Sequence, residues 1–129
     1  MSKFLFWILI QFDIAAFLFC DLLVPPSIEE GPTEVAVTVE TRAMLMCDTL
    51  GLPKPEVTWE KNQKIIPASG SRYMMHRTGS LQFSAVQVED AGTYRCVANN
   101  EAGTVYRDIT LTVQGLLKLF FWLQFKLGF

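Results

Sequence analysis

Apolar residues recur at every second position through the middle of the chain, between residues 25 and 114. This period places alternate side chains on one face of an extended strand, and no window of ten residues here has the spacing of an amphipathic helix. The alternating positions are Val35, Val37 and Val39; Ala43, Leu45 and Cys47; Val57 and Trp59; Leu81 and Phe83; Tyr94, Cys96 and Ala98; and Ile109, Leu111 and Val113.

Turn-forming residues separate these runs, at 51–55, 61–64, 68–71, 78–80, 89–92 and 99–103. Gly, Pro, Asn and Asp favour turns for backbone reasons, so each cluster marks the end of a strand. Many short strands without helices in about 90 residues predict an all-β fold, a sandwich of two antiparallel sheets packed face to face.

The two ends of the chain do not share this pattern. Residues 1–24 contain 19 apolar positions and residues 115–129 contain 10, and Phe83 is the one Phe of ten that lies between them. We therefore expect three parts: a hydrophobic leader at 1–24, a domain at 25–114 and a hydrophobic tail at 115–129.

The leader has a short basic start, Met1 to Lys3, and continues as an apolar stretch, which is typical of a secretory signal peptide. Asp13 interrupts the apolar stretch, so a membrane anchor or a leader foreign to the domain are the alternatives. Cleavage after Cys20 would leave Cys47 and Cys96, an even number that favours export.

The tail would be about 22 Å long as a helix, shorter than a hydrocarbon core of roughly 30 Å. Lys118, Gln124 and Lys126 also interrupt it. It is therefore not a convincing membrane span, and the simplest hypothesis is a truncated or mis-assembled end outside any evolved module. Membrane association through the two hydrophobic ends is left open.

Charge and chemistry narrow the function. The net charge of -2 is spread without blocks, so the chain lacks the basic stripe that nucleic acids require. The single histidine, His76, has no catalytic partner at a meaningful spacing, and we expect it to be solvated. No His, Cys or carboxylate motif has the spacing of a metal site. We therefore expect no catalytic residues, no metal and no cofactor.

One constellation of residues is more specific. Trp59 lies twelve residues after Cys47, Cys96 lies 49 residues after Cys47, and Tyr94 lies two residues before Cys96 in the segment DAGTYRC. Both cysteines occupy inward positions of their strands, so their side chains can meet in the core. The pattern resembles the immunoglobulin fold, in which two strand cysteines bridge the sheets, a Trp packs on the bridge and a Tyr forms a corner.

The details resemble the intermediate (I) set of that fold. The resemblance implies a disulfide between Cys47 and Cys96, an ion pair between Arg72 and Asp90, and a core position at Leu81. Redox-active thiols and a ligand-binding Arg–Asp pair are the alternatives. The segments VPPSIEEGP, GSLQF and VEDAGTYRCVANNEAG are most similar to the repeats of hemicentin, a long extracellular-matrix protein.

Two outer surfaces are candidates for binding. Because Leu45 and Cys47 point inward, Met44 and Met46 point outward, and strand parity adds Met74. The alternative is that these are isolated exposed residues without a role. The second surface is charged and carries Glu60, Arg95 and Asp108.

The resemblance implies a non-enzymatic extracellular interaction module of a matrix or cell-adhesion protein. Its partners would be neighbouring immunoglobulin modules or other matrix and adhesion proteins. The alternative is a structural domain of a giant intracellular muscle protein, where the cysteines would stay reduced. A weaker third hypothesis is a module attached to an enzyme encoded in a longer chain.

Overall fold

A computed structural model describes residues 22–115 and 124–128 of the chain. The predicted leader therefore lies outside the described residues except for 22–24, and the predicted tail except for 115 and 124–128. The strands are β1 (Val24–Ile28), β2 (Glu34–Thr38), β3 (Ala43–Leu45), β4 (Thr49–Leu52), β5 (Glu56–Lys61), β6 (Lys64–Ile66), β7 (Tyr73–Met75), β8 (Leu81–Phe83), β9 (Gly92–Asn100) and β10 (Gly103–Gln114), with a 3-10 turn, η1 (Val88–Asp90), before β9.

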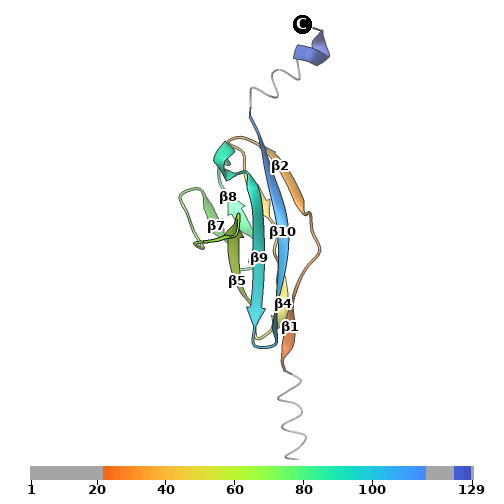
Figure 1. Ribbon diagram of the computed structural model, residues 1–129, viewed down its shortest axis with the longest axis vertical. Coiled ribbons are helices and arrows are strands. Elements are labelled where there is room, and N and C mark those ends of the chain that lie inside the picture. Colours follow the sequence, from red (N-terminus) through yellow and green to blue (C-terminus); the bar gives the residue numbers. More distant parts are fainter. Residues whose placement is uncertain (1–21, 116–123, 129) are drawn as a thin grey trace, which may run out of the picture.

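The strands form a sandwich (Figure 1). One layer is a five-stranded sheet in the order β2-β10-β9-β5-β6; facing it are a three-stranded sheet, β3-β8-β7, and a two-stranded sheet, β1-β4. The all-β sandwich predicted from the sequence is confirmed.

The prediction that both sheets are antiparallel is wrong at one edge, because β2 pairs parallel to β10, with Val35 opposite Leu111. The chain passes from β1 in one layer to β2 in the other through residues 29–33 without reversing direction. It therefore arrives beside β10 running the same way.

The core lies between the two layers, on the alternating positions of the sequence. The side chains of Leu45, Leu81, Phe83, Tyr94, Ile109 and Leu111 are at most 2% exposed. Val35, Val37, Val57 and Val113 are partly buried and pack against this cluster. Val86 is also fully buried, although it lies in a loop between β8 and η1 where no alternation marks it.

The alternating runs of the sequence did not mark β1, β4, β6 or β7. β1 contains Pro25 and Pro26, which have no N–H to donate, and its pairing with β4 is irregular between Val24 and Ser27. β4 extends through Leu52, so the turn expected at 51–55 begins only at Pro53. Within the described residues, no helix is long and apolar enough to cross a membrane.

Candidate interaction surfaces

The two layers are fastened together at the centre of the sandwich. Cys47 and Cys96 form a disulfide, and both residues are fully buried. Trp59 lies opposite Cys96 in the pairing of β5 with β9 and is 2% exposed. Its indole N–H donates to the carbonyl oxygen of Gly79 at 2.8 Å. The full burial of the sulfur atoms favours a structural role for these cysteines over a redox role.

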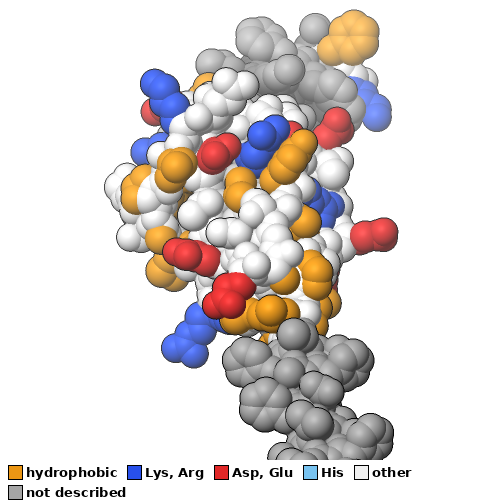
Figure 2. Space-filling model, turned by 60° about the horizontal axis from the view of Figure 1, so that its bottom comes forward, with side chains coloured by type: hydrophobic (Ala, Val, Ile, Leu, Met, Phe, Trp, Pro, Cys, Tyr) orange, Lys and Arg blue, Asp and Glu red, His pale blue; other side chains and the backbone are white. Residues whose placement is uncertain are grey.

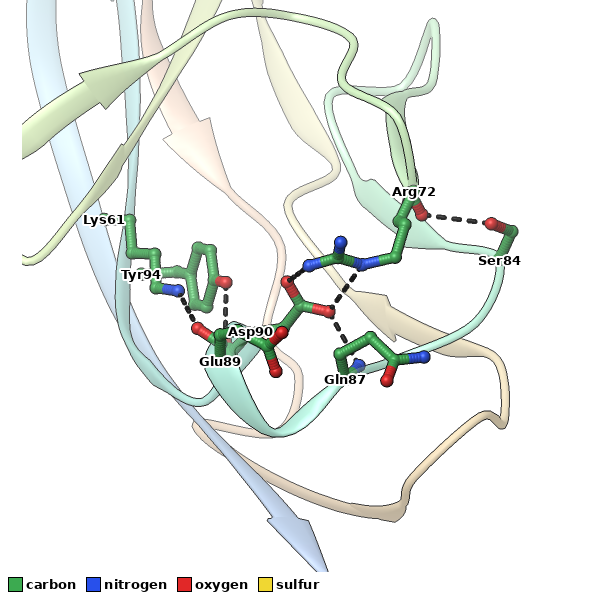
Figure 3. A network of polar contacts seen from close by, with 7 residues as sticks. All are labelled: Lys61, Arg72, Ser84, Gln87, Glu89, Asp90 and Tyr94. Atoms are coloured by element: carbon green, nitrogen blue, oxygen red, sulfur yellow. Dashed lines mark hydrogen bonds and ion pairs between the residues drawn. The ribbon is translucent and has the colours of Figure 1, made fainter.

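A polar network closes one end of the sandwich around Asp90 (Figure 3). Nη2 of Arg72 donates to Oδ1 of Asp90 at 2.7 Å, and the backbone N–H of Gln87 donates to Oδ2 at 2.8 Å. The Tyr94 hydroxyl donates to the backbone carbonyl oxygen of Asp90 at 2.6 Å. Nζ of Lys61 donates to the carbonyl oxygen of Glu89 at 2.6 Å.

This network changes two pKa values in opposite directions. Burial by itself would raise the pKa of Asp90, but the hydrogen bonds from Arg72 and Gln87 and the charge of Arg72 outweigh it and hold that pKa below its usual range. Burial, aided by the nearby charge of Asp90, raises the pKa of the Tyr94 hydroxyl well above its usual value. The ion pair thus joins Arg72, which directly precedes β7, to Asp90 at the end of η1.

The first outer surface is the methionine face, which consists of Met44, Met46 and Met74. Their side chains are exposed, by 40%, 36% and 57%. Met44 and Met74 are the register partners of Gln82 on its two sides, so both lie on the outer face of the sheet β3-β8-β7. His76, which we expected to be solvated, is half-buried, and its Nε2 contacts Oε1 of Gln82.

The second outer surface is the charged hollow on the five-stranded sheet. Its volume is about 460 Å³, and the residues that line it are Glu60, Asn62, Gln63, Thr93, Arg95 and Asp108. Register places Arg95 between Glu60 on β5 and Asp108 on β10. Arg95 donates to both carboxylate oxygens of Asp108, at 2.7 and 3.1 Å.

The guanidinium group of Arg95 also contacts the aromatic ring of Tyr106. It lies 4.2 Å from the centre of the Tyr106 ring, which is within the range of a cation–π contact. The hydrogen bonds from Arg95 lower the pKa of Asp108 despite its partial burial. Tyr106 is 63% exposed and was missed in the sequence, because only the register of β9 against β10 brings it to Arg95.

A third exposed feature is the apolar end, which consists of Leu22, Leu23, Val24, Leu50 and Leu52. Each of these residues is more than 40% exposed, and Val24 lies opposite Leu52 in the pairing of β1 with β4. Figure 2, in which this end comes forward, shows hydrophobic side chains gathered there. Sequence alternation could not reveal this apolar end, because β4 was not predicted.

The described residues include no cluster of three or more His, Cys, Asp or Glu that could hold a metal ion. The features described above are surfaces on a frame, the sandwich bridged by its disulfide. Such a frame can present side chains in fixed positions to a partner.

Comparison with known proteins agrees with this architecture. A model of the immunoglobulin I-set domain matches residues 26–113. Hemicentin-1 of Mus musculus is 41% identical over 93 residues, which is 70% of this chain but 2% of that protein. Protein sidekick-1 of Homo sapiens is 38% identical over 94 residues, again 70% of this chain and 4% of that protein. The similarity to hemicentin repeats is confirmed, and the chain spans only a few per cent of these relatives.

Solved structures show the same fold. A chain in the crystal structure of the Titin M10–Obscurin like 1 Ig complex superposes with a TM-score of 0.66 at 34% identity, covering 71% of this chain and 96% of that one. Sidekick-1 immunoglobulin domains 1–4 give a TM-score of 0.67 at 28% identity, covering 71% of this chain and 25% of that one. Sequence, sandwich topology and the buried disulfide agree, and the chain belongs to the immunoglobulin I-set domain family.

Proposed function

We propose that this chain is a non-enzymatic extracellular interaction module of a matrix or cell-adhesion protein. Its partners are neighbouring immunoglobulin modules or other matrix and adhesion proteins. The similarity to hemicentin-1 and sidekick-1 supports this role for the module. Because the chain spans a small part of each relative, the proposal concerns the module and not the whole of a longer protein.

The buried disulfide between Cys47 and Cys96 is the observation that carries the extracellular location. Disulfides form and persist in oxidising compartments such as the secretory pathway, whereas cytosolic thiols are kept reduced. A leader at 1–24 that acts as a signal peptide would deliver the chain to such a compartment.

The second candidate is a structural domain of a giant intracellular muscle protein. The similarity to a chain in the Titin M10–Obscurin like 1 Ig complex favours it, since the match covers 96% of that chain. In the cytosol the same fold would stand without the bridge, with Cys47 and Cys96 as free thiols.

Mass spectrometry of the full chain expressed in eukaryotic cells separates the two candidates. We expect the protein in the medium, with a mass that corresponds to loss of the leader. After unfolding, it should show no thiol that reacts with a maleimide. Protein retained in the cell with an intact leader and free thiols at Cys47 and Cys96 would contradict the extracellular proposal.

The methionine face and the charged hollow are the surfaces on which we propose that partners dock. Methionine side chains adapt to different partner shapes, and a contiguous exposed apolar patch is typical of an interface. Replacing Met44 and Met46 with Thr should weaken self-association at least several-fold, as measured by sedimentation equilibrium. Val88→Thr is the matched control, because Val88 is 60% exposed and lies in η1, outside the strands that carry Met44 and Met74. Equal association of both variants and the parent would remove the methionine face from the proposal.

A further inference from the structure

The five-stranded sheet has two edge strands, β2 and β6, which differ in how well they are protected against pairing with another chain. β6 has three residues, contains Lys64 and ends just before Pro67, and these features block pairing at an edge. β2 has five residues and contains neither lysine nor proline. Within the described residues, no strand pairs with the outer edge of β2, which lies at one side of the sandwich (Figure 1).

The backbone groups of β2 point alternately toward β10 and toward this open edge. The carbonyl oxygen of Thr33 accepts from the N–H of Thr110, and the N–H of Val39 donates to the carbonyl oxygen of Gln114. The odd-numbered residues of β2 therefore face β10, because every second residue of a strand bonds to the same neighbour. The residues whose backbone groups face the open edge are Glu34, Ala36 and Thr38.

These three residues can pair with the same three residues of a second copy. In an antiparallel pairing about a twofold axis at Ala36, the two Ala36 residues exchange both of their N–H···O bonds. Glu34 of each copy then lies opposite Thr38 of the other, so that the Thr38 N–H donates to the Glu34 carbonyl oxygen. The Thr38 carbonyl oxygen adds nothing, because it already accepts from the N–H and the hydroxyl of Thr41.

Charge and backbone chemistry favour this register over its neighbours. The acidic side chain of Glu34 lies beside the neutral Thr38, whereas like charges directly opposite each other destabilise a strand pair. A shift of two residues in one direction would place Pro32, which has no N–H, opposite Thr38. The opposite shift would place Glu34 beside Glu40, a like charge whose N–H already donates to the carbonyl oxygen of Val86.

We propose that a second copy of this chain pairs with the open edge of β2, antiparallel and centred on Ala36, and that the two five-stranded sheets thereby become one continuous sheet. The pairing rests on the interaction role proposed above and names one partner for it. It uses neither the methionine face nor the charged hollow, and the extracellular location is tested separately, by secretion and by the state of the thiols.

A disulfide trap tests the pairing in the full chain carrying Cys20→Ser, so that no native free thiol competes. The Cα atoms of the two Ala36 residues would lie about 5.5 Å apart, within the range that a disulfide spans. Ala36→Cys should therefore form a covalent dimer under mild oxidation, measured on non-reducing gels. Thr112→Cys is the matched control, since Thr112 is exposed on β10 as the register partner of Ala36. It lies one strand, about 4.8 Å, further from the axis in each copy, so its dimer should form at least tenfold more slowly.

Charge variants test the twofold axis independently of the trap. Ala36→Lys and Ala36→Glu each bring two like charges together at the axis, so each variant alone should associate at least several-fold more weakly than the parent in sedimentation equilibrium. An equimolar mixture of the two should associate again, because each mixed pair places opposite charges side by side. A mixture no more associated than its components, or equal trapping of Ala36→Cys and Thr112→Cys, would overturn the proposal.

The methionine face provides the last comparison. Met44→Thr with Met46→Thr, introduced into the Ala36→Cys chain, should leave the rate of trapping unchanged, because the pairing along β2 does not use these side chains. Loss of trapping in this variant would assign the contact between copies to the methionine face and overturn the pairing along β2.

Discussion

Asp90 is a nearly buried carboxylate, 7% exposed, that accepts hydrogen bonds from Arg72 and from the backbone of Gln87. Its pKa is lowered in the folded protein, so the folded state holds fewer protons on this group than the unfolded state does. The stability that results is present above the unfolded pKa of about 3.9 and is lost as the pH falls through the lower, folded pKa.

Asp90→Asn should therefore make the free energy of unfolding depend less on pH in the acid range. At pH 7 we expect the free energy of unfolding to fall by on the order of 1–3 kcal/mol, because Arg72 and the Gln87 N–H lose the carboxylate charge and one of the two acceptor oxygens. The difference from the parent should shrink between about pH 5 and pH 2 as the parent carboxylate is protonated. Urea unfolding at a series of pH values measures this.

Asp108→Asn is the matched control for Asp90→Asn. The side chain of Asp108 is 44% exposed and also pairs with an arginine. Surface pairs contribute little to stability, so this variant should unfold close to the parent at pH 7. An equal loss from both substitutions would show that burial of the Asp90 network does not matter.

The raised pKa of Tyr94 predicts that the stability of the protein also depends on pH on the alkaline side. Burial raises the pKa of its hydroxyl in the folded state, so the unfolded state loses this proton first as the pH rises. Its contribution is complete below about pH 10, the ordinary value, and is lost at higher pH.

Tyr94→Phe should destabilise the protein by on the order of 1–3 kcal/mol at pH 7, because the carbonyl of Asp90 loses its donor. Above about pH 10 the gap to the parent should close. Thermal unfolding between pH 7 and 11 measures both effects. Tyr106→Phe, on the exposed face, serves as the control, and a gap that stays constant with pH would contradict the assignment.

Among the strands, β1 depends on a residue that is far away in the sequence. The Asn100 side chain donates to the carbonyl oxygens of Val24 and Pro53, at 2.8 and 3.0 Å, and accepts from the backbone N–H of Ala102 at 2.8 Å. One amide thus holds the start of β1, the loop before β5 and the turn between β9 and β10.

Asn100→Ala should loosen this end of the molecule before the rest. We expect backbone amides of β4 that pair with β1 to exchange hydrogen at least tenfold faster, while those in the centre of β9 stay protected. Asn99→Ala is the control, since Asn99 is exposed and, among the described residues, its side chain only accepts a hydrogen bond from the Thr104 hydroxyl. Uniform acceleration in both strands would indicate global destabilisation instead.

Strands whose one face is fully buried could be predicted from alternation, as for β3, β8 and β9. β1 and β4 could not, because they bury few side chains: Pro26 is the one buried residue of β1, and β4 has none. The parallel pairing of β2 also escaped, because alternation carries no information about direction.

Some residues of the candidate surfaces and of the polar network could likewise be predicted from the sequence, and others could not. The outward positions of Met44 and Met74 followed from strand parity alone. Lys61, Gln87 and Tyr106 were not singled out, because their partners are set by the register of strands and by the path of the chain before β9. Strand register and the path of the chain depend on packing between residues that are distant in sequence.

The disulfide acts on the molecule as a whole, since it closes a loop of 49 residues across both sheets. In the chain-entropy model such a bridge removes unfolded-state entropy equivalent to roughly 4 kcal/mol. Cys47→Ala with Cys96→Ala should lower the free energy of unfolding by about that amount, as measured by urea denaturation. A loss well under 1 kcal/mol would mean that packing around Trp59 holds the sheets together without the bridge.

The parallel pairing of β2 with β10 has a mechanical consequence. The domain begins and ends at opposite ends of its long axis (Figure 1), and the pairing extends from Glu34 opposite Thr110 to Thr38 opposite Gln114. Tension applied to the two ends pulls β2 and β10 in opposite directions along their length. The hydrogen bonds between them are then loaded in shear, all together, instead of opening one after another like a zipper. In a chain of such modules, force along the long axis would be borne in each module by the short pairing of β2 with β10.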